Sequence, residues 1–157
     1  MKANSRIPDY SHIQKAPLSL SLCTMVIAGL GIAWHIGDTL GIYIAGGVGL
    51  LIALLAPVFH HLTVEDEGDL LAIRFGPVPL FRRTVRYADI GSVEVGRTLI
   101  LEGWGVHWSM RGGWVWNLWG RDCAVVCFNE GGVLRIGTDD AWNLADFLQG
   151  QIGGRKM

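Results

Sequence analysis

The sequence is poor in charged residues and in cysteine, and both shortages narrow what the chain can be. Charged residues make up 17% of the 157 positions, whereas 50% are hydrophobic, which is more apolar than a typical soluble domain. The formal net charge of −1 provides no strong field of one sign, so nucleic acid is not expected as a partner. The three cysteines, Cys23, Cys123 and Cys127, form no disulfide framework, and we expect reduced thiols.

Charge is missing altogether from two long stretches, residues 18–36 and 40–59. Each has about the 20 residues that cross a hydrocarbon layer of ~30 Å. Gly37, Asp38 and Thr39 leave room only for a tight turn between them. A polar arm, residues 1–17, precedes the first stretch, and no small-x-small cleavage signal stands before the second stretch. Both features argue against a signal peptide. The sequence therefore predicts a two-helix transmembrane hairpin over residues 18–59.

Basic residues predict the orientation of this hairpin. The arm carries Lys2, Arg6 and Lys15, whereas the turn has only Asp38 with His35 beside it. After the second stretch come Arg74, Arg82, Arg83 and Arg86. The positive-inside rule therefore places both chain ends and the following domain on the cytoplasmic side.

Small residues recur at four-residue spacing in both stretches. They are Gly29, Ala33 and Gly37 in the first, and Gly41, Ala45, Gly49 and Ala53 in the second. Such positions let helix backbones approach closely. Two interpretations stay open: the stripes pack the hairpin against itself, or one of them receives a partner helix.

Beyond residue 61 the pattern changes to short apolar runs separated by turn residues about every ten positions, which is typical of an antiparallel all-β domain. We expect strands at residues 70–75, 81–87, 92–95, 98–102, 106–110, 114–118, 124–128 and 133–136. Thr138 or Asp139 can then cap a helix, whose apolar residues recur at helical spacing. The sequence predicts a β domain over residues 62–152, closed by a helix at 139–152 and followed by a tail, residues 153–157.

Two segments of this domain resemble a known family. One is the stretch GWGVHW (103–108), RGGWVWN (111–117) and GRD (120–122), and the other is LRIGTDD (134–140). They resemble bacterial membrane proteins with a pleckstrin-homology-like (PH-like) domain, some of which carry a two-helix anchor ahead of it. The resemblance covers about residues 60–152. It implies a bacterial inner-membrane location and a fold, but no activity and no site, because the family has no generally assigned function.

The expected fold class is therefore an α+β membrane protein. The transmembrane hairpin comes first, and a PH-like β-barrel or sandwich capped by one C-terminal helix follows it. The membrane is the first expected partner of such a chain.

Five of the seven tryptophans fall within sixteen positions: Trp104, Trp108, Trp114, Trp116 and Trp119. A domain this small rarely buries five indole rings, and tryptophan is favoured at protein interfaces and at membrane–water interfaces. Three roles stay open for these residues: the core, contact with a protein partner, and contact with lipid headgroups. We treat them as candidate partner-binding residues.

The arginines Arg74, Arg82, Arg83 and Arg86 form the strongest basic cluster in the sequence. Basic residues close to a membrane attract anionic headgroups by about 1 kcal/mol each. The alternative is a solvated face. These four residues are the candidate lipid-headgroup contacts.

Histidines offer weak evidence for a bound group. His60 and His61 follow the second apolar stretch, where they are either interfacial residues or ligands of a haem or chlorophyll. His107, Cys123 and Cys127 lack the paired spacing of a zinc site. We expect no metal and no cofactor.

No phosphate loop, nucleophile elbow or metal-binding helix motif appears, so no catalytic residue is expected. The sequence favours a non-enzymatic, membrane-anchored PH-like module, an accessory, assembly or scaffolding subunit of a larger membrane complex. Its expected partners are other membrane proteins or a second copy of the chain. The alternative is a module that binds anionic phospholipid headgroups.

Overall fold

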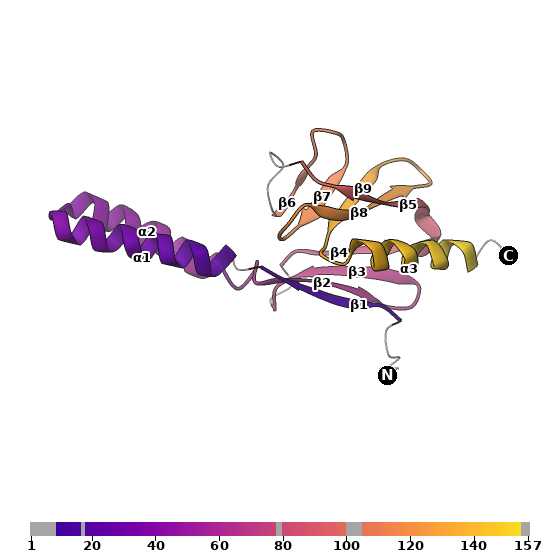
Figure 1. Cartoon of the computed structure of the whole chain (residues 1–157), viewed down its shortest axis with the longest axis horizontal. Helices are drawn as coiled ribbons and strands as arrows, with labels where there is room; N and C mark the ends of the chain where they lie inside the picture. The colour runs from indigo at the N-terminus through magenta and orange to yellow at the C-terminus, as the bar shows by residue number, and fades with distance from the viewer. Residues whose placement is uncertain (1–8, 17, 78–79, 100–104, 155–157) are drawn as a thin grey trace.

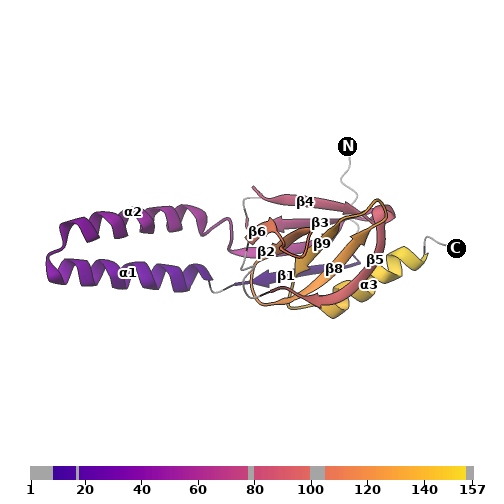
Figure 2. The ribbon, with the colours of Figure 1, turned by 90° about the horizontal axis from the view of Figure 1, so that it is seen from above.

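The computed structural model describes residues 9–16, 18–77, 80–99 and 105–154. In these residues two helices form a projecting hairpin, and two β-sheets with a third helix form a domain at its base (Figure 1). The described part is thus an α+β fold. The hairpin leaves one end of the domain, so the molecule is elongated (Figure 2).

The projecting hairpin consists of α1 (Leu18–Ile36) and α2 (Thr39–Leu55). Gly37 makes the reversal with φ of 72°, a conformation that glycine adopts without strain. Alanine and glycine allow the helices to approach, because Ala33 is buried and a Cβ atom on Gly49 would meet Val26 Cγ1 at 2.7 Å. The helices therefore pack closely along their small residues.

The prediction of two transmembrane spans is wrong. The second span was expected to reach residue 59, but α2 ends at Leu55, because Pro57 follows and proline disfavours helix in the residue before it. Its 17 residues rise about 26 Å, less than the ~30 Å of a hydrocarbon layer. In the described residues no helix is both long and apolar enough to cross a membrane. This finding contradicts the two-span anchor, the integral membrane partner and the inner-membrane location.

The first sheet has the strand order β1-β2-β3-β4 and is antiparallel throughout. Its strands are β1 (Ser11–Lys15), β2 (His61–Asp66), β3 (Leu70–Phe75) and β4 (Arg82–Arg86). β1 belongs to the segment expected to be a polar arm. Because β1 precedes the helices and β2 follows them, the hairpin is inserted between two neighbouring strands.

The second sheet has the order β5-β8-β9-β7-β6, in which only β7 and β9 are parallel within the described ranges. Its strands are β5 (Ile90–Arg97), β6 (Gly105–Trp108), β7 (Trp114–Asn117), β8 (Asp122–Phe128) and β9 (Val133–Gly137). A single 3-10 turn, η1 (Tyr87–Asp89), links the two sheets. The expected strand at 98–102 lies partly outside the described residues.

The core lies between the two sheets and α3 (Ala141–Gly154). Side chains alternate along the strands, so Ile73 and Phe75 of the first sheet face Val126 and Ile136 of the second. From α3, Leu144 adds a buried side chain, and burial of a leucine contributes about 1.5–3 kcal/mol. Asp140 N–H donates to Thr138 Oγ1 (3.1 Å) just before the helix begins.

Candidate functional site

The tryptophans do not form one surface. Trp116 is only 6% exposed, and its ring centroid lies 5.8 Å from that of Phe75 in the core. Trp108 and Trp114 are exposed partners across β6 and β7, with their rings edge to face at 5.7 Å. Trp104 lies outside the described residues. The tryptophan-rich stretch thus divides between the core and separate exposed places.

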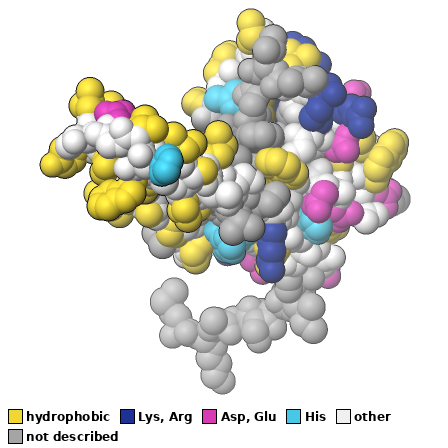
Figure 3. Space-filling model, turned by 60° about the vertical axis from the view of Figure 1, so that its left-hand side comes forward, with side chains coloured by type: hydrophobic (Ala, Val, Ile, Leu, Met, Phe, Trp, Pro, Cys, Tyr) yellow, Lys and Arg dark blue, Asp and Glu magenta, His cyan; other side chains and the backbone are white. Residues whose placement is uncertain are grey.

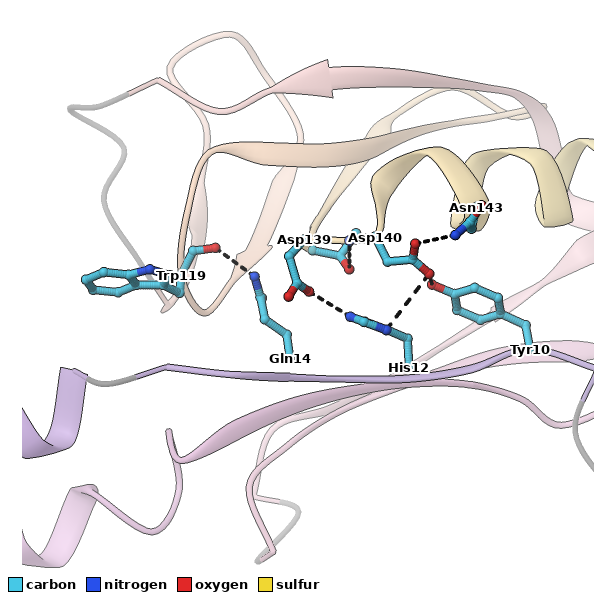
Figure 4. Close-up of polar contacts among 8 residues, drawn as sticks. Tyr10, His12, Gln14, Trp119, Asp139, Asp140 and Asn143 are labelled. Atoms are coloured by element: carbon cyan, nitrogen blue, oxygen red, sulfur yellow. Dashed lines mark hydrogen bonds and ion pairs between the residues drawn. The ribbon is translucent and has the colours of Figure 1, made fainter.

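Trp119 occupies a different place, in the connection between β7 and β8. Its carbonyl accepts a hydrogen bond from Gln14 Nε2 (3.0 Å) on β1. Figure 4 shows its ring at the end of the domain from which α1 leaves. This residue therefore belongs with the base of the hairpin, apart from Trp108 and Trp114.

Two of the four candidate headgroup arginines are paired with acids. Arg74 contacts both Glu65 (3.3 Å) and Glu67, and Arg82 lies 3.4 Å from Glu67. These carboxylates neutralise much of the charge that the sequence suggested for a headgroup site. Exposed pairs of this kind contribute about 1 kcal/mol or less to stability.

The other two arginines, Arg83 and Arg86, point to opposite faces of β4. Arg83 alternates with Arg82 and Arg86 and shares a face with the buried Val85. Partial burial lowers the pKa of the Arg83 guanidinium from its ordinary value. The four arginines are therefore distributed over two faces of the sheet.

The histidines His60 and His61 lie at the base of the hairpin, with ring centroids 5.8 Å apart. His61 is opposite Lys15 in the β1–β2 pair. Burial lowers the pKa of His61, and the neighbouring His60 and Lys15 lower it further. Over the described ranges, no group of three His, Cys, Asp or Glu side chains is placed to hold a metal ion.

A polar cluster joins β1 to the start of α3 (Figure 4). His12 Nε2 lies 2.7 Å from Asp139 Oδ1, and His12 Nδ1 lies 3.9 Å from Asp140 Oδ2. The Tyr10 hydroxyl donates to Asp140 Oδ2 (3.1 Å). Burial, and then Asp140, raises the pKa of Tyr10 well above its ordinary value. The cluster fastens the strand that leads into the hairpin to the C-terminal helix.

Sequence reasoning missed this cluster because its members are far apart in the chain. His12 and Asp139 are separated by 127 positions, and no motif spacing connects them. The one available signal was the alternation of Tyr10, His12 and Gln14, which is compatible with a strand. An acid and a histidine alone define no reaction, and the geometry gives this cluster a role in holding two elements together.

The hairpin carries most of the exposed large apolar side chains of the described part. Exposed large side chains on α1 are Met25, Ile27, Ile32, Trp34 and Ile36. Those on α2 are Leu40, Tyr43, Ile44, Val48, Leu50, Leu51, Leu54 and Leu55. Figure 3 shows hydrophobic side chains over the projecting hairpin. An apolar patch of this extent marks an interaction site.

The small-residue stripes divide between the inside and outside of the hairpin. An added Cβ on Gly41 would meet Asp38 and Ala33, and one on Gly49 would meet Val26. By contrast, a Cβ on Gly29 would meet nothing within 4 Å. Gly37 makes the turn, Ala45 is half-buried and Ala53 is exposed. The α2 stripe thus packs the hairpin against itself, mainly through its two glycines.

Two comparisons with known proteins find no match. No protein-family model matches the chain, and no curated protein matches it. The apolar outer surface of the hairpin is therefore the feature from which a function is best inferred.

Proposed function

We propose that the chain is a non-enzymatic binding module that acts as an accessory or scaffolding subunit of a larger protein assembly. The α1–α2 hairpin enters an apolar cleft of a partner protein, and the two-sheet domain stays outside the cleft. The PH-like resemblance belongs to the same proposal, supported by two sheets followed by a single C-terminal helix.

The observation that carries the proposal is the uncovered apolar surface of the hairpin. Residues 18–36 and 40–59 contain no charged side chain, and many of the large side chains there are exposed. A helix that is hydrophobic on all sides is ordinarily buried. Each large apolar side chain left in water forgoes about 1.5–3 kcal/mol, so the hairpin needs a covering that this chain does not provide.

The distribution of exposed residues indicates how the partner covers the hairpin. At 100° per residue, the exposed positions of α2 spread over roughly half of its circumference, and α1 has its own exposed side. A flat partner surface that contacts only one side of the hairpin would leave the other exposed apolar side chains in water. We therefore infer a cleft that surrounds the hairpin, with Gly29, Gly46 and Gly47 offering room for close approach.

The domain provides a rigid base for the hairpin. Phe59, just after α2, lies 5.5 Å from Phe75 and 5.7 Å from Phe81, measured between ring centroids. On the other side, β1 is bonded to β2 and fastened to α3. Both ends of the hairpin are thus fixed in one sheet. A headgroup-binding role is less well supported, because Arg74 and Arg82 are paired with acids.

The test is site-specific photo-crosslinking in cells of the source. A benzophenone amino acid replaces Ile32 on α1 or Leu51 on α2, and the control position is Trp142 on α3, which is 78% exposed. We expect one and the same protein to be crosslinked from both hairpin positions and not from Trp142. The crosslinked protein, once purified, must then form a stoichiometric complex with the full chain. The double variant Ile32→Gln with Leu51→Gln must disrupt this complex.

Four results contradict the proposal. The hairpin positions could crosslink only to lipid, the chain could bind protein-free vesicles through the hairpin, or Ile32 and Leu51 could crosslink only to a second copy of this chain. Different proteins from the two positions would also overturn it, since one cleft must reach both helices.

A further inference from the structure

We propose that the cleft receiving the hairpin is edged by carboxylate side chains, which contact a basic and aromatic collar at the hairpin's base. This inference rests on the proposed function and specifies the chemistry of the partner. The collar consists of Lys15, Leu80, Phe81, Arg83, Trp119 and Arg121.

The collar residues come from three separate segments that meet where the hairpin leaves the domain. Lys15 ends β1, shortly before α1 begins. Phe81, just before β4, lies at the same end, because Phe75 N–H donates to Phe81 O and Gly76 N–H donates to His61 O at the start of β2. Trp119 is held there by Gln14 (Figure 4). Anything that surrounds the hairpin to its base must therefore meet the collar.

The apolar part of the collar continues the hairpin surface. Leu80 is 68% exposed. The Phe81 ring is exposed on one side and contacts Phe59, which follows α2. Trp119 adds an indole next to β1, across the side chain of Gln14. The apolar contact of the hairpin therefore extends onto the domain.

The charged part of the collar is positive and uncompensated. In the described residues Lys15, Arg83 and Arg121 form no ion pair, whereas the nearby Arg97 is paired with Asp122 at 2.8 Å. Arg121 donates only to the carbonyl of Thr98, at 3.5 Å. Three cations around one apolar stalk favour a partner surface of opposite charge.

Acidic side chains gather at the opposite end of the domain. β2 runs away from the hairpin (Figure 2), so its turn into β3 places Asp69 far from the collar. Asp89 and Glu130 lie at that same end, since Asn129 N–H donates to Asp89 O. These three acids lie at the same end as one arginine outside the collar, Arg86. The difference in charge between the two ends favours an approach in which the hairpin leads toward an anionic rim.

The charge test uses the purified full chain in nonionic detergent, with poly-L-glutamate as the probe and poly-L-lysine as its counterpart. We expect the chain to bind poly-L-glutamate, more weakly as salt rises. The double variant Lys15→Glu with Arg121→Glu should weaken this binding roughly tenfold. The matched control is Arg86→Glu, an exposed arginine at the far end of β4, which should leave binding unchanged. If charge reversal disturbs folding, Lys15→Gln with Arg121→Gln should give a smaller loss in the same direction.

The contact test places the benzophenone amino acid at Leu80, which is 68% exposed, with Met110, which is 84% exposed, as the control. The protein crosslinked from Leu51 should also be crosslinked from Leu80, at an acidic segment, and not from Met110. A loss of poly-L-glutamate binding in the Arg86→Glu variant as large as that in the Lys15→Glu, Arg121→Glu double variant would overturn the inference. So would collar-dependent binding to phosphatidylglycerol vesicles without binding to poly-L-glutamate. If Leu51 crosslinks a protein that Leu80 does not reach, the inference fails while the proposed function stands.

Discussion

At the scale of single residues, two tyrosine–aspartate pairs hold separate parts of the domain together. The Tyr87 hydroxyl donates to Asp66 at 2.6 Å inside the domain, and the Tyr10 hydroxyl donates to Asp140 at 3.1 Å. Hydrogen bonds to a charged acceptor contribute about 1.5–3 kcal/mol. Asp66 also accepts from Gly68 N–H at 2.9 Å, so this carboxylate is tied to its own turn as well.

Tyr10 makes the free energy of unfolding decrease at alkaline pH. Its pKa is raised in the folded chain, first by burial and then by Asp140, whereas an unfolded tyrosine titrates near 10. Its contribution to the free energy of unfolding is therefore complete below pH ~10 and is lost as the pH rises above that value. We expect Tyr10→Phe to flatten this alkaline decline in urea unfolding at successive pH values. Tyr43→Phe, on the exposed hairpin, is the control, and an unchanged decline in Tyr10→Phe would exclude this origin.

At the scale of elements, the hairpin is held together by contacts on one side of α2. Gly41 and Gly49 lie against α1, whereas Gly46 and Gly47 face open space. The same residue type therefore serves two purposes in one helix. On the inner side it permits close packing, and on the outer side it leaves room for another molecule.

This difference predicts opposite effects of the same substitution. Gly49→Leu must push the helices apart, because even its Cβ would meet Val26 Cγ1 at 2.7 Å, and overpacking costs about 1–3 kcal/mol. A Cβ atom at Gly46 would meet nothing within 4 Å, and Gly46→Leu replaces glycine by a better helix former, a gain of up to about 1 kcal/mol. Thermal unfolding of the helical circular-dichroism signal in detergent should thus show a lower midpoint for Gly49→Leu only. Equal midpoints would contradict the close packing of Gly49 against α1.

Elements with a strong local pattern could be predicted from the sequence, and those that depend on distant partners could not. β3 lies at the expected residues 70–75, and α3 begins within two residues of its expected start. β1 was missed because a short polar strand is specified by its partner β2, which lies beyond the hairpin. The end of α2 was placed too late, although Pro57 was a visible stop signal.

The candidate site was predictable only in part for the same reason. The apolar character of the hairpin is a property of consecutive residues and was evident. The pairing of Arg74 and Arg82 with Glu65 and Glu67 depends on strand register. The meeting of Lys15, Leu80 and Trp119 at one end depends on the arrangement of the sheets, which composition does not reveal.

At the scale of the whole molecule, the hairpin and the domain have opposite surface chemistry. The domain buries its apolar side chains between two sheets and a helix, whereas the hairpin exposes them. In water without detergent the exposed apolar surfaces must find one another. The isolated full chain is therefore expected to self-associate without a defined stoichiometry.

Polar residues on the hairpin should suppress this association. We expect a chain with Ile32→Gln, Leu51→Gln and Leu54→Gln to sediment as a smaller species than the natural chain in detergent-free buffer. Glutamine substitutions on the domain, at Trp108 and Met110, should reduce the size of the sedimenting species much less. Analytical ultracentrifugation over a tenfold concentration range distinguishes these outcomes, and a natural chain that is monomeric throughout would contradict the expectation.

The insertion of the hairpin between β1 and β2 has a consequence for modularity. Lys15 and His61 are directly opposite each other in the sheet, which is the spacing that a two-residue type I′ turn closes. In topological terms, everything between them is one connecting loop of a β-hairpin. The helical segment can therefore be lengthened, shortened or exchanged for another without altering the strand register. The same domain can carry different inserted segments.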